Sequence, residues 1–229
     1  MGPLLARDHA LSGALAFTAS APRLHVHSPA ALAAGAVFTA GAATAPDIDE
    51  HGSTISRTLG FFTEAVSWVV HKVSGGHRMG THSIAGVAAF TLAALVAVHY
   101  ATGMPGKLVL GLILAVLLAA GIRALRIGGH HADVIGLGAA AAAVYWHAGL
   151  GLVPVCIGLG AAAHIAGDEL THDGCPLGWP VSKREYHLLP HGLRITTGKA
   201  AEHWIVGPAL FVATCYLVYR DVGIGRIGL

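Results

Sequence analysis

The chain has 229 residues, of which 54% are hydrophobic and 11% are charged. Soluble chains carry about 25% charged residues. This composition, with a mean hydropathy of +0.64, excludes a soluble domain and indicates a polytopic membrane protein. The formal charge is only +2 and the basic residues are dispersed, so we expect membrane lipids, and no nucleic acid, as partners.

Seven apolar segments approach the length of about 20 residues that a bilayer-spanning helix needs. Two of them, the first and the fifth, are short, so we expect an all-α transmembrane bundle of five to seven spans. The first segment can also be interpreted as a cleavable signal peptide, but Asp8 and His9 at its start favour a retained helix. The segments are 9–21, 29–45, 83–100, 107–125, 131–146, 150–168 and 203–219.

The pattern contains no internal repeat, and we expect one integral-membrane domain over residues 1–229. If all the segments cross, the polar loops 46–82 and 169–202 lie on one face, together with residues 1–8 and 126–131. Together with Arg123, at the end of the segment 107–125, this motif face carries ten of the 14 Lys and Arg residues. The positive-inside rule therefore predicts that the motif face is cytoplasmic.

The polar insertion between the second and third segments contains one amphipathic stretch, residues 57–73. Its apolar residues recur at spacings of three and four, as they do in a helix that lies at the membrane interface. A helix packed over the bundle explains the same pattern. The apolar positions are Leu59, Phe62, Val66, Val69, Val70 and Val73.

Two acidic residues follow the second apolar segment, at the point where Pro46 stops the helix. Asp47 and Asp49 can both turn toward one cation, because carboxylate oxygens are hard donors. An acidic loop is more often solvated than a metal ligand, so this motif alone does not decide between the two interpretations.

Two histidines precede the third apolar segment. His77 and His82 offer imidazoles, which are the commonest metal ligands. Arg78, between them, can bind a phosphate or carboxylate through two N–H groups. Thr81 or Ser83 can cap the helix that follows. An ordinary loop with two histidines remains the alternative.

The third motif lies at the end of the sixth apolar segment. His164, Asp168 and His172 are spaced four residues apart, so on a helix they form one stripe of nitrogen and oxygen donors. Gly174 and Pro176 are predicted to end that helix. The alternative is a helix end with a capping Asp and a solvated His, but His164 stands among apolar residues, where an uncoordinated imidazole needs another polar partner.

The three motifs belong to the same face, and together they favour a divalent metal site. Carboxylates grouped in a low-dielectric setting repel one another unless cations lie among them. The imidazoles favour zinc, whereas the carboxylates make manganese or magnesium possible. The predicted ligands are Asp47, Asp49, His77, His82, His164 and Asp168, with His9 at the start of the first segment as a further candidate.

Four motifs in this order resemble the YdjM-type family of bacterial membrane-bound, predicted metal-dependent hydrolases. They are His9, PDID at 46–49, GHRxxTHS at 76–83 and HxxxDxxTxxGxxLxWP at 164–180. The resemblance implies a polytopic inner-membrane protein with a metal centre built from these motifs. The step from His164 to Asp168 is also similar to the helix-borne ligands of zinc-dependent phospholipase C and P1-type nucleases. The chain departs from the family at Glu50, where many relatives carry His.

The function we predict is metal-assisted hydrolysis of a small-molecule phosphoester or a lipid ester at the cytoplasmic membrane interface. In this mechanism Arg78 stabilises negative charge on the substrate and His172 donates a proton to the leaving group. The alternatives are a metal transporter, a metal sensor and a structural membrane protein without catalysis. Transport is disfavoured because the centres of the spans carry almost no ion ligands. The sequence leaves the oligomeric state open.

Overall fold

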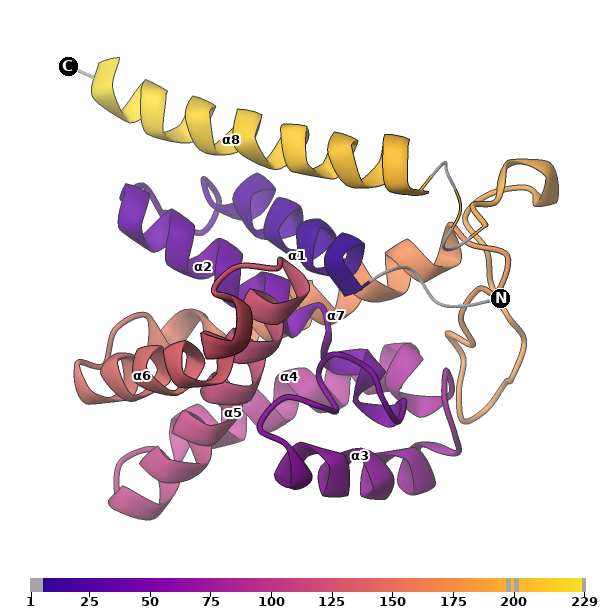
Figure 1. Cartoon of the computed structure of the whole chain (residues 1–229), viewed down its shortest axis with the longest axis horizontal. Coiled ribbons are helices and arrows are strands. Elements are labelled where there is room, and N and C mark those ends of the chain that lie inside the picture. The colour runs from indigo at the N-terminus through magenta and orange to yellow at the C-terminus, as the bar shows by residue number, and fades with distance from the viewer. Residues whose placement is uncertain (1–5, 197–198, 200–201, 228–229) are drawn as a thin grey trace.

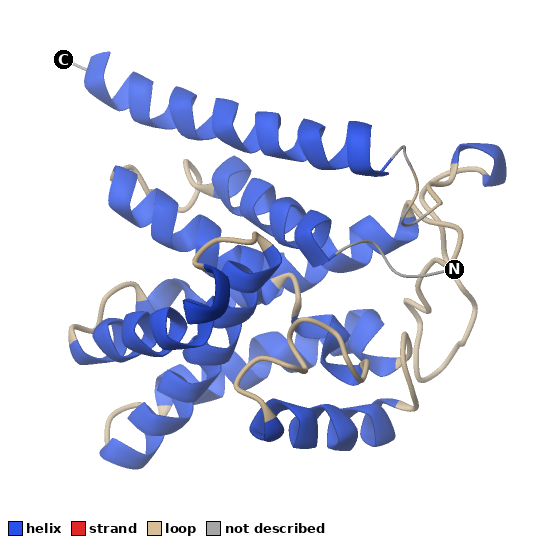
Figure 2. Cartoon of the chain, viewed as in Figure 1, coloured by secondary structure: helices blue, strands red, loops and turns tan. Residues whose placement is uncertain are grey.

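The computed structural model describes residues 6–196, 199 and 202–227, and each predicted apolar segment forms a helix (Figures 1 and 2). The described residues contain only two isolated β-bridges and no longer strand. The predicted all-α fold is therefore confirmed. The helices are α1 (Ala6–Ser20), α2 (Pro29–Ala42), α4 (Ile84–His99), α5 (Met104–Ala124), α6 (Ala132–Tyr145), α7 (Val153–Glu169) and α8 (Gly207–Ile227).

Four helical stretches in the described chain are long and apolar enough to cross a membrane. They are Pro29–Asp49, Met104–Ala124, Leu150–Glu169 and Trp204–Val222. The helix α4 is apolar but shorter, and α1 and α6 have 15 and 14 residues. The expected number of five to seven spans thus depends on whether these shorter helices also cross the bilayer.

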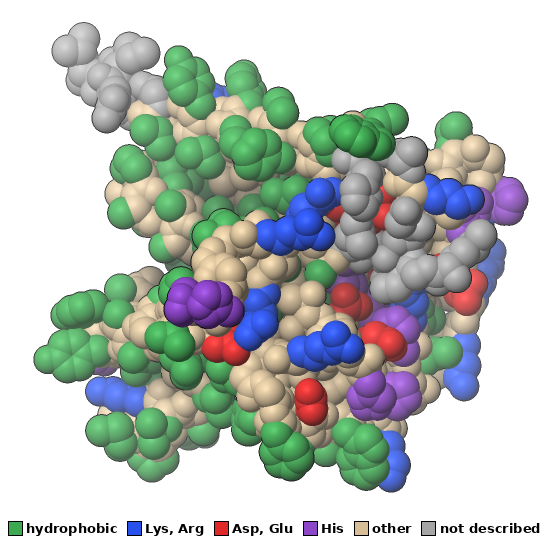
Figure 3. All heavy atoms as spheres, viewed as in Figure 1, with side chains coloured by type: hydrophobic (Ala, Val, Ile, Leu, Met, Phe, Trp, Pro, Cys, Tyr) green, Lys and Arg blue, Asp and Glu red, His purple; other side chains and the backbone are tan. Residues whose placement is uncertain are grey.

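The helices pack so that the polar connections gather at one end of the bundle. Helix α1 contacts α2, α7 and α8, while α4 packs on α7 and α5 packs on α2 and α6. Figure 1 shows the end of α7, the start of α8 and the start of α1 on the same side of the view, beside the long loop that follows α7. In Figure 3 hydrophobic side chains cover α8, whereas most visible acidic and histidine side chains lie toward that polar end.

Small residues allow α2 to approach its neighbours closely at two points. A Cβ atom placed on Gly160 of α7 would lie 2.7 Å from the backbone of Ala42 and Ala43, and one on Gly41 would lie 1.8 Å from the carbonyl oxygen of Leu117 in α5. Any side chain at these positions would push the helices apart. These contacts hold the end of α2 directly against α7, which carries His164 one turn after Gly160.

The amphipathic stretch forms α3 (Phe61–Ser74), which begins after Gly60 and ends at Gly75 in the left-handed conformation. Its polar side faces the protein, since Thr63 and Ser67 are buried. Much of its apolar side is turned outward, with Val69 53% and Val73 76% exposed. Phe62, Val66 and Val70 of the same helix line a groove against α4 and α5, so α3 both packs on the bundle and presents other apolar residues outward.

Candidate metal centre

The short 3₁₀ helix η1 (Ala45–Asp49) carries the first pair of carboxylates into the protein. Pro46 occupies its first turn, where a missing N–H is harmless. The tight turn follows α2 directly and buries both acidic residues, with Asp47 7% and Asp49 0% exposed. Buried carboxylates need hydrogen bonds or cations to offset their lost hydration.

A second 3₁₀ turn, η2 (Gly80–His82), places His82 at the start of α4. Ser83 caps that helix, because its Oγ accepts a hydrogen bond from the backbone N–H of Gly86 at 3.1 Å. His82 is completely buried. The capping position thus belongs to Ser83, which leaves the hydroxyl of Thr81 available for another partner.

The last turns of α7 present His164 and Asp168 to the same point, as their spacing of four residues predicts. Both are completely buried, and His164 Nε2 lies 3.5 Å from Asp168 Oδ2. The prediction that His172 continues this stripe is wrong, because α7 ends at Glu169. His172 lies in the following loop, where its ring contacts that of His191.

The first helix also contributes to this point, through His9. Its imidazole is stacked on that of His164, with the ring centroids 3.6 Å apart. His9 Nε2 lies 3.4 Å from Asp168 Oδ1. The helix α1 is therefore part of the bundle that forms the site.

Five buried side chains from these four elements meet, and we call them the inner cluster. His82 Nε2 and His164 Nε2 lie 3.1 Å apart. Each of these nitrogens lies 3.6 Å from Asp47 Oδ1, and His82 Nε2 lies 3.6 Å from Asp168 Oδ2. The inner cluster consists of His9, Asp47, His82, His164 and Asp168.

The inner cluster has the donor set of a cation site. Its residues form two groups of three possible ligands, and within each group the donor atoms lie within 4.8 Å of one another. One group is His9, His164 and Asp168, and the other is Asp47, His82 and His164. Asp47 Oδ1, both carboxylate oxygens of Asp168 and both ring nitrogens of His9 lack a hydrogen-bond partner among the described residues. Buried polar atoms are rarely left unpaired, so these residues fit a bound cation.

The ring nitrogens that face away from the cluster have partners that fix the orientation of each imidazole. His164 Nδ1 lies 2.7 Å from the carbonyl oxygen of Ala43 and must donate its proton there. His82 Nδ1 lies 3.0 Å from Thr81 Oγ1, whose own proton goes to Asp49 Oδ2. Both histidines therefore turn an Nε2 lone pair toward the cluster, the arrangement that metal-binding histidines adopt.

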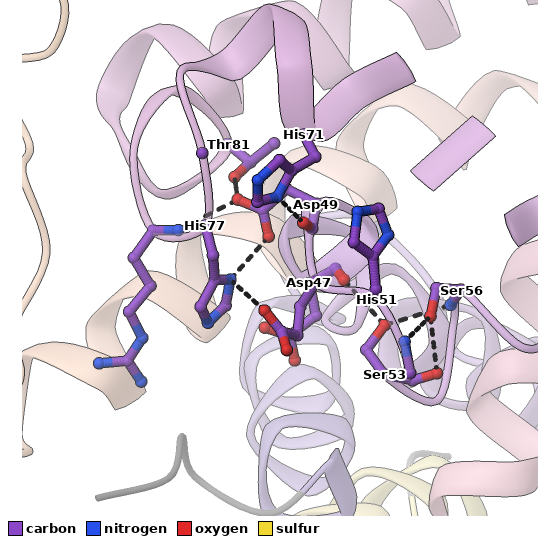
Figure 4. Close-up of polar contacts among 12 residues, drawn as sticks. Asp47, Asp49, His51, Ser53, Ser56, His71, His77 and Thr81 are labelled. Carbon is purple, nitrogen blue, oxygen red and sulfur yellow. Dashed lines mark hydrogen bonds and ion pairs between the residues drawn. The ribbon is translucent and has the colours of Figure 1, made fainter. Parts of the chain in front are cut away.

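Asp49 has a different environment from Asp47, because both of its carboxylate oxygens accept hydrogen bonds (Figure 4). His77 Nδ1 lies 2.9 Å from Oδ1, and the backbone N–H of Arg78 donates to Oδ2 at 3.1 Å. Thr81 donates its hydroxyl proton to Oδ2. Asp49 therefore links η1 to the loop of residues 77–81 through hydrogen bonds, while Asp47 faces the inner cluster.

The guanidinium of Arg78 lies at the edge of the inner cluster. Its Nη2 is 3.3 Å from Asp168 Oδ1 and its Nη1 is 3.1 Å from Asp173 Oδ2. The side chain is 14% exposed, so it reaches from the cluster toward the surface. Asp173, in the loop after α7, orients this arginine from the outer side.

The charges around His82 favour its protonated form in the absence of a cation. Burial alone lowers the pKa of a histidine, but hydrogen bonds and charge from Asp47 and Asp49 outweigh burial and raise the pKa of His82 to about 9. A proton on this imidazole therefore occupies, at neutral pH, the position where a cation would bind.

The sequence-predicted site residues thus fall into four groups. Arg78 lies at the edge of the inner cluster, Asp49 and His77 lie behind it, and His172 lies apart. The inner cluster itself is formed by His9, Asp47, His82, His164 and Asp168. Sequence reasoning did not identify the carbonyl of Ala43, the hydroxyl of Thr81 as a partner of Asp49, or Asp173 as a partner of Arg78. A backbone carbonyl has no residue signature, but Thr81 and Asp173 lie within the motifs themselves.

The histidine pair at the start of the fifth apolar segment does not join the inner cluster. Asp133 instead forms an ion pair with Arg123, with Nε and Oδ1 2.9 Å apart. His130 and His131 contact each other and are exposed.

Comparison with known proteins identifies one family. The family model described as YdjM inner membrane protein matches residues 4–225, nearly the whole chain. No curated protein and no solved structure matches the chain.

Proposed function

We propose that this chain, which belongs to the YdjM inner membrane protein family, is a divalent-metal-dependent hydrolase that acts on a phosphoester or lipid ester at the membrane interface. The proposal rests on one observation. Two buried imidazole nitrogens, on His82 and His164, and the carboxylates of Asp47 and Asp168 converge on one point, and three of the carboxylate oxygens lack a hydrogen-bond partner in the described part of the chain.

The residues that would hold the metal are those of the inner cluster. Imidazole nitrogens combined with carboxylate oxygens suit zinc first and manganese second. Because Nδ1 of His164 donates to the carbonyl of Ala43, His164 can bind a metal only through Nε2, so the two donor groups that share it would serve one ion. Thr81 would keep His82 oriented and basic by accepting a hydrogen bond from its Nδ1–H while donating its own proton to Asp49.

A bound divalent ion of this kind supplies a Lewis acid and lowers the pKa of water. Residues of this chain would bind and orient the substrate. Arg78 would bind a negatively charged substrate oxygen through the N–H groups that face the cluster, and Asp168 and Asp173 would keep the guanidinium in place. Because His172 lies outside the helix that carries Asp168, we do not assign to it the proton transfer to the leaving group.

The position of the ligands argues against transport. The inner cluster lies at the polar end of the bundle, at the ends of α2 and α7 and the starts of α1 and α4. The buried core described for these helices consists of Ala, Val, Leu, Ile and Phe side chains with one cysteine, Cys156, so it offers few donors along a path across the membrane. A purely structural cation remains the alternative, and activity measurements separate it from the hydrolase.

The test uses the full chain purified in detergent. Metal content is measured by elemental analysis, and hydrolysis of a panel of phosphodiesters and lipid esters is measured with and without chelator. We expect bound divalent metal and chelator-sensitive hydrolysis. His164→Ala should lose metal and activity together, whereas Arg78→Ala should retain metal and lose roughly 10²–10³-fold in rate.

The matched control is His130→Ala, which removes an exposed histidine outside the inner cluster and should change neither quantity. Bound metal without any hydrolysis in the parent protein would favour the structural role. Metal movement across a vesicle membrane would favour transport. Full metal content and full activity in His164→Ala would contradict the proposed site.

A further inference from the structure

An apolar groove lies on the membrane side of the inner cluster, between α3, α4 and α5. It encloses about 290 Å³. Thr63 is the one polar side chain among its lining residues, and its hydroxyl already donates to the carbonyl of Gly60 at 3.2 Å. The groove therefore offers no free polar group to a ligand. Its walls include Ile48, Phe62, Val66, Ala93, Leu112 and Ile157.

The groove is closed at its base and open to the outside of the bundle. Ile48 and Ile157 at the base are 7% and 4% exposed, whereas Phe62 and Leu112 at the rim are 46% and 37% exposed. Leu112 lies in the middle of α5, a helix long enough to span the membrane. The opening thus faces the region where lipid acyl chains are the available apolar molecules.

Two of the elements that line the groove, η1 and α7, also carry residues of the inner cluster, and the groove extends from them toward the middle of the bundle. Ile157 precedes His164 by seven residues, which puts it on the same face of α7 about 10 Å further from the polar end. Phe90 and Ala93 lie further along α4, which begins two residues after His82. Ile48, at the base, stands between Asp47 and Asp49 in η1. One end of the groove therefore adjoins the inner cluster at Ile48.

We propose that this groove binds one acyl chain of a membrane phospholipid and so presents the lipid's ester or phosphoester group to the inner cluster. The inference rests on the proposed function for the reaction, but the binding of the chain can be tested without any reaction. The expected substrate is a lipid with a long acyl tail, which should be preferred to a water-soluble ester that carries the same head group. The outward apolar face of α3 extends the same surface toward the interface.

The first experiment measures binding alone. The full chain is placed in phosphatidylcholine nanodiscs that contain phosphatidylglycerol with a diazirine on one acyl chain, and the labelled peptides are mapped after illumination. We expect labels concentrated on the groove segments of α3, α4 and α5. Ala93→Phe, which fills the groove, should lower this labelling about tenfold, the loss that corresponds to roughly two methylene groups that are no longer buried.

The matched control is Ala89→Phe, which adds the same side chain to an exposed alanine one turn earlier on α4, outside the groove lining. It should leave the labelling unchanged. Ala93→Leu introduces a smaller side chain and allows the same comparison if the Ala93→Phe variant does not fold. Labels spread evenly over the outward faces of α4, α5 and α8, or labelling unaffected by both Ala93 variants, would overturn the proposal. A dimer that dissociates in Ala93→Phe would indicate instead that a second copy occupies the groove.

The second experiment separates the groove from the reaction. Hydrolysis of a lipid ester with 16-carbon chains is compared with that of the same head group carrying six-carbon chains. Ala93→Phe should lower kcat/KM for the long-chain ester about tenfold and leave the short-chain ester unchanged. Equal loss for both esters would overturn the tail site while leaving the hydrolase intact. Selective labelling without hydrolysis of either ester would keep the tail site and contradict the proposed function.

Discussion

His82 Nε2 and His164 Nε2 lie 3.1 Å apart in the protein interior, although 82 residues separate them in the chain. Each Nδ1 has a partner on the other side of its ring, Thr81 for His82 and the carbonyl of Ala43 for His164. Two lone pairs that face each other at this distance repel unless a proton or a cation lies between them. Two nitrogens bound to one zinc ion, each about 2.0–2.1 Å from it, would be separated by about 3–3.4 Å.

The partners behind the inner cluster should tune its affinity for metal. Thr81→Val removes the hydroxyl that joins His82 Nδ1 to Asp49. Loss of such a partner costs about 10–100-fold in metal affinity, which competition with a chelating dye would measure. Thr91→Val on α4, whose hydroxyl donates only to its own helix at Val87, is the control. Equal affinities for both variants would show that the orientation of His82 does not depend on Thr81.

Metal binding should become stronger as the pH rises. Asp47 and Asp49 outweigh the effect of burial and raise the pKa of His82 to about 9, so below that pH a proton must leave before a cation binds. For one released proton the affinity should increase about tenfold per pH unit up to about pH 9. Calorimetry in buffers of different ionisation enthalpy measures the released proton. A metal affinity that stays constant between pH 7 and 9 would contradict this assignment.

The same shift in pKa predicts the opposite trend for the metal-free protein. Protonated His82 stabilises the fold fully below its unfolded pKa of 6.5, and this contribution is lost as the pH rises from 6.5 through about 9. Thermal unfolding of the chelator-treated protein in detergent should therefore show a falling midpoint over this interval. His82→Gln should remove that dependence.

Close packing of α2 on α7 should be essential for the site. Gly160→Ala places a Cβ atom 2.7 Å from the backbone of Ala42 and Ala43, which should cost about 1–3 kcal/mol of stability and weaken metal binding. Gly138→Ala on α6 is the control, because no atom lies within 4 Å of the added Cβ. Calorimetric unfolding and metal titration of both variants make the comparison. An unchanged Gly160→Ala protein would mean that α7 tolerates displacement from α2.

The motif face should be cytoplasmic, since ten of the 14 basic residues flank it. A reporter enzyme that works only in the cytoplasm should be active when it is fused after Lys199, and a periplasmic reporter at the same position should be inactive. A fusion after Gly149, in the opposite connection, is the control with the reverse expectation. Periplasmic activity after Lys199 would reverse the orientation without altering the geometry of the site.

The sequence by itself determined the membrane class, the helices and most of the inner cluster. Apolar runs of sufficient length can hide their backbone polar groups only as helices, so the positions of α1, α2 and α4–α8 follow from hydropathy. Four of the five cluster residues were predicted as ligands from the sequence. His164 and Asp168 were predicted from their spacing on one helix, and Asp47 and His82 from the polar motifs that adjoin apolar segments. The fifth residue, His9, was predicted from the family resemblance and from its position at the start of the first segment.

Only the tertiary structure decided which donors point inward. Asp47 and Asp49 are equivalent in the sequence, but the 3₁₀ turn directs one carboxylate to the inner cluster and gives the other to His77, Arg78 and Thr81. The end of α7 at Glu169 removed His172 from the stripe, because helix ends depend on tertiary contacts as well as on local sequence. The apolar groove likewise combines side chains from five elements, η1, α3, α4, α5 and α7, and such a long-range arrangement leaves no periodic pattern in the sequence.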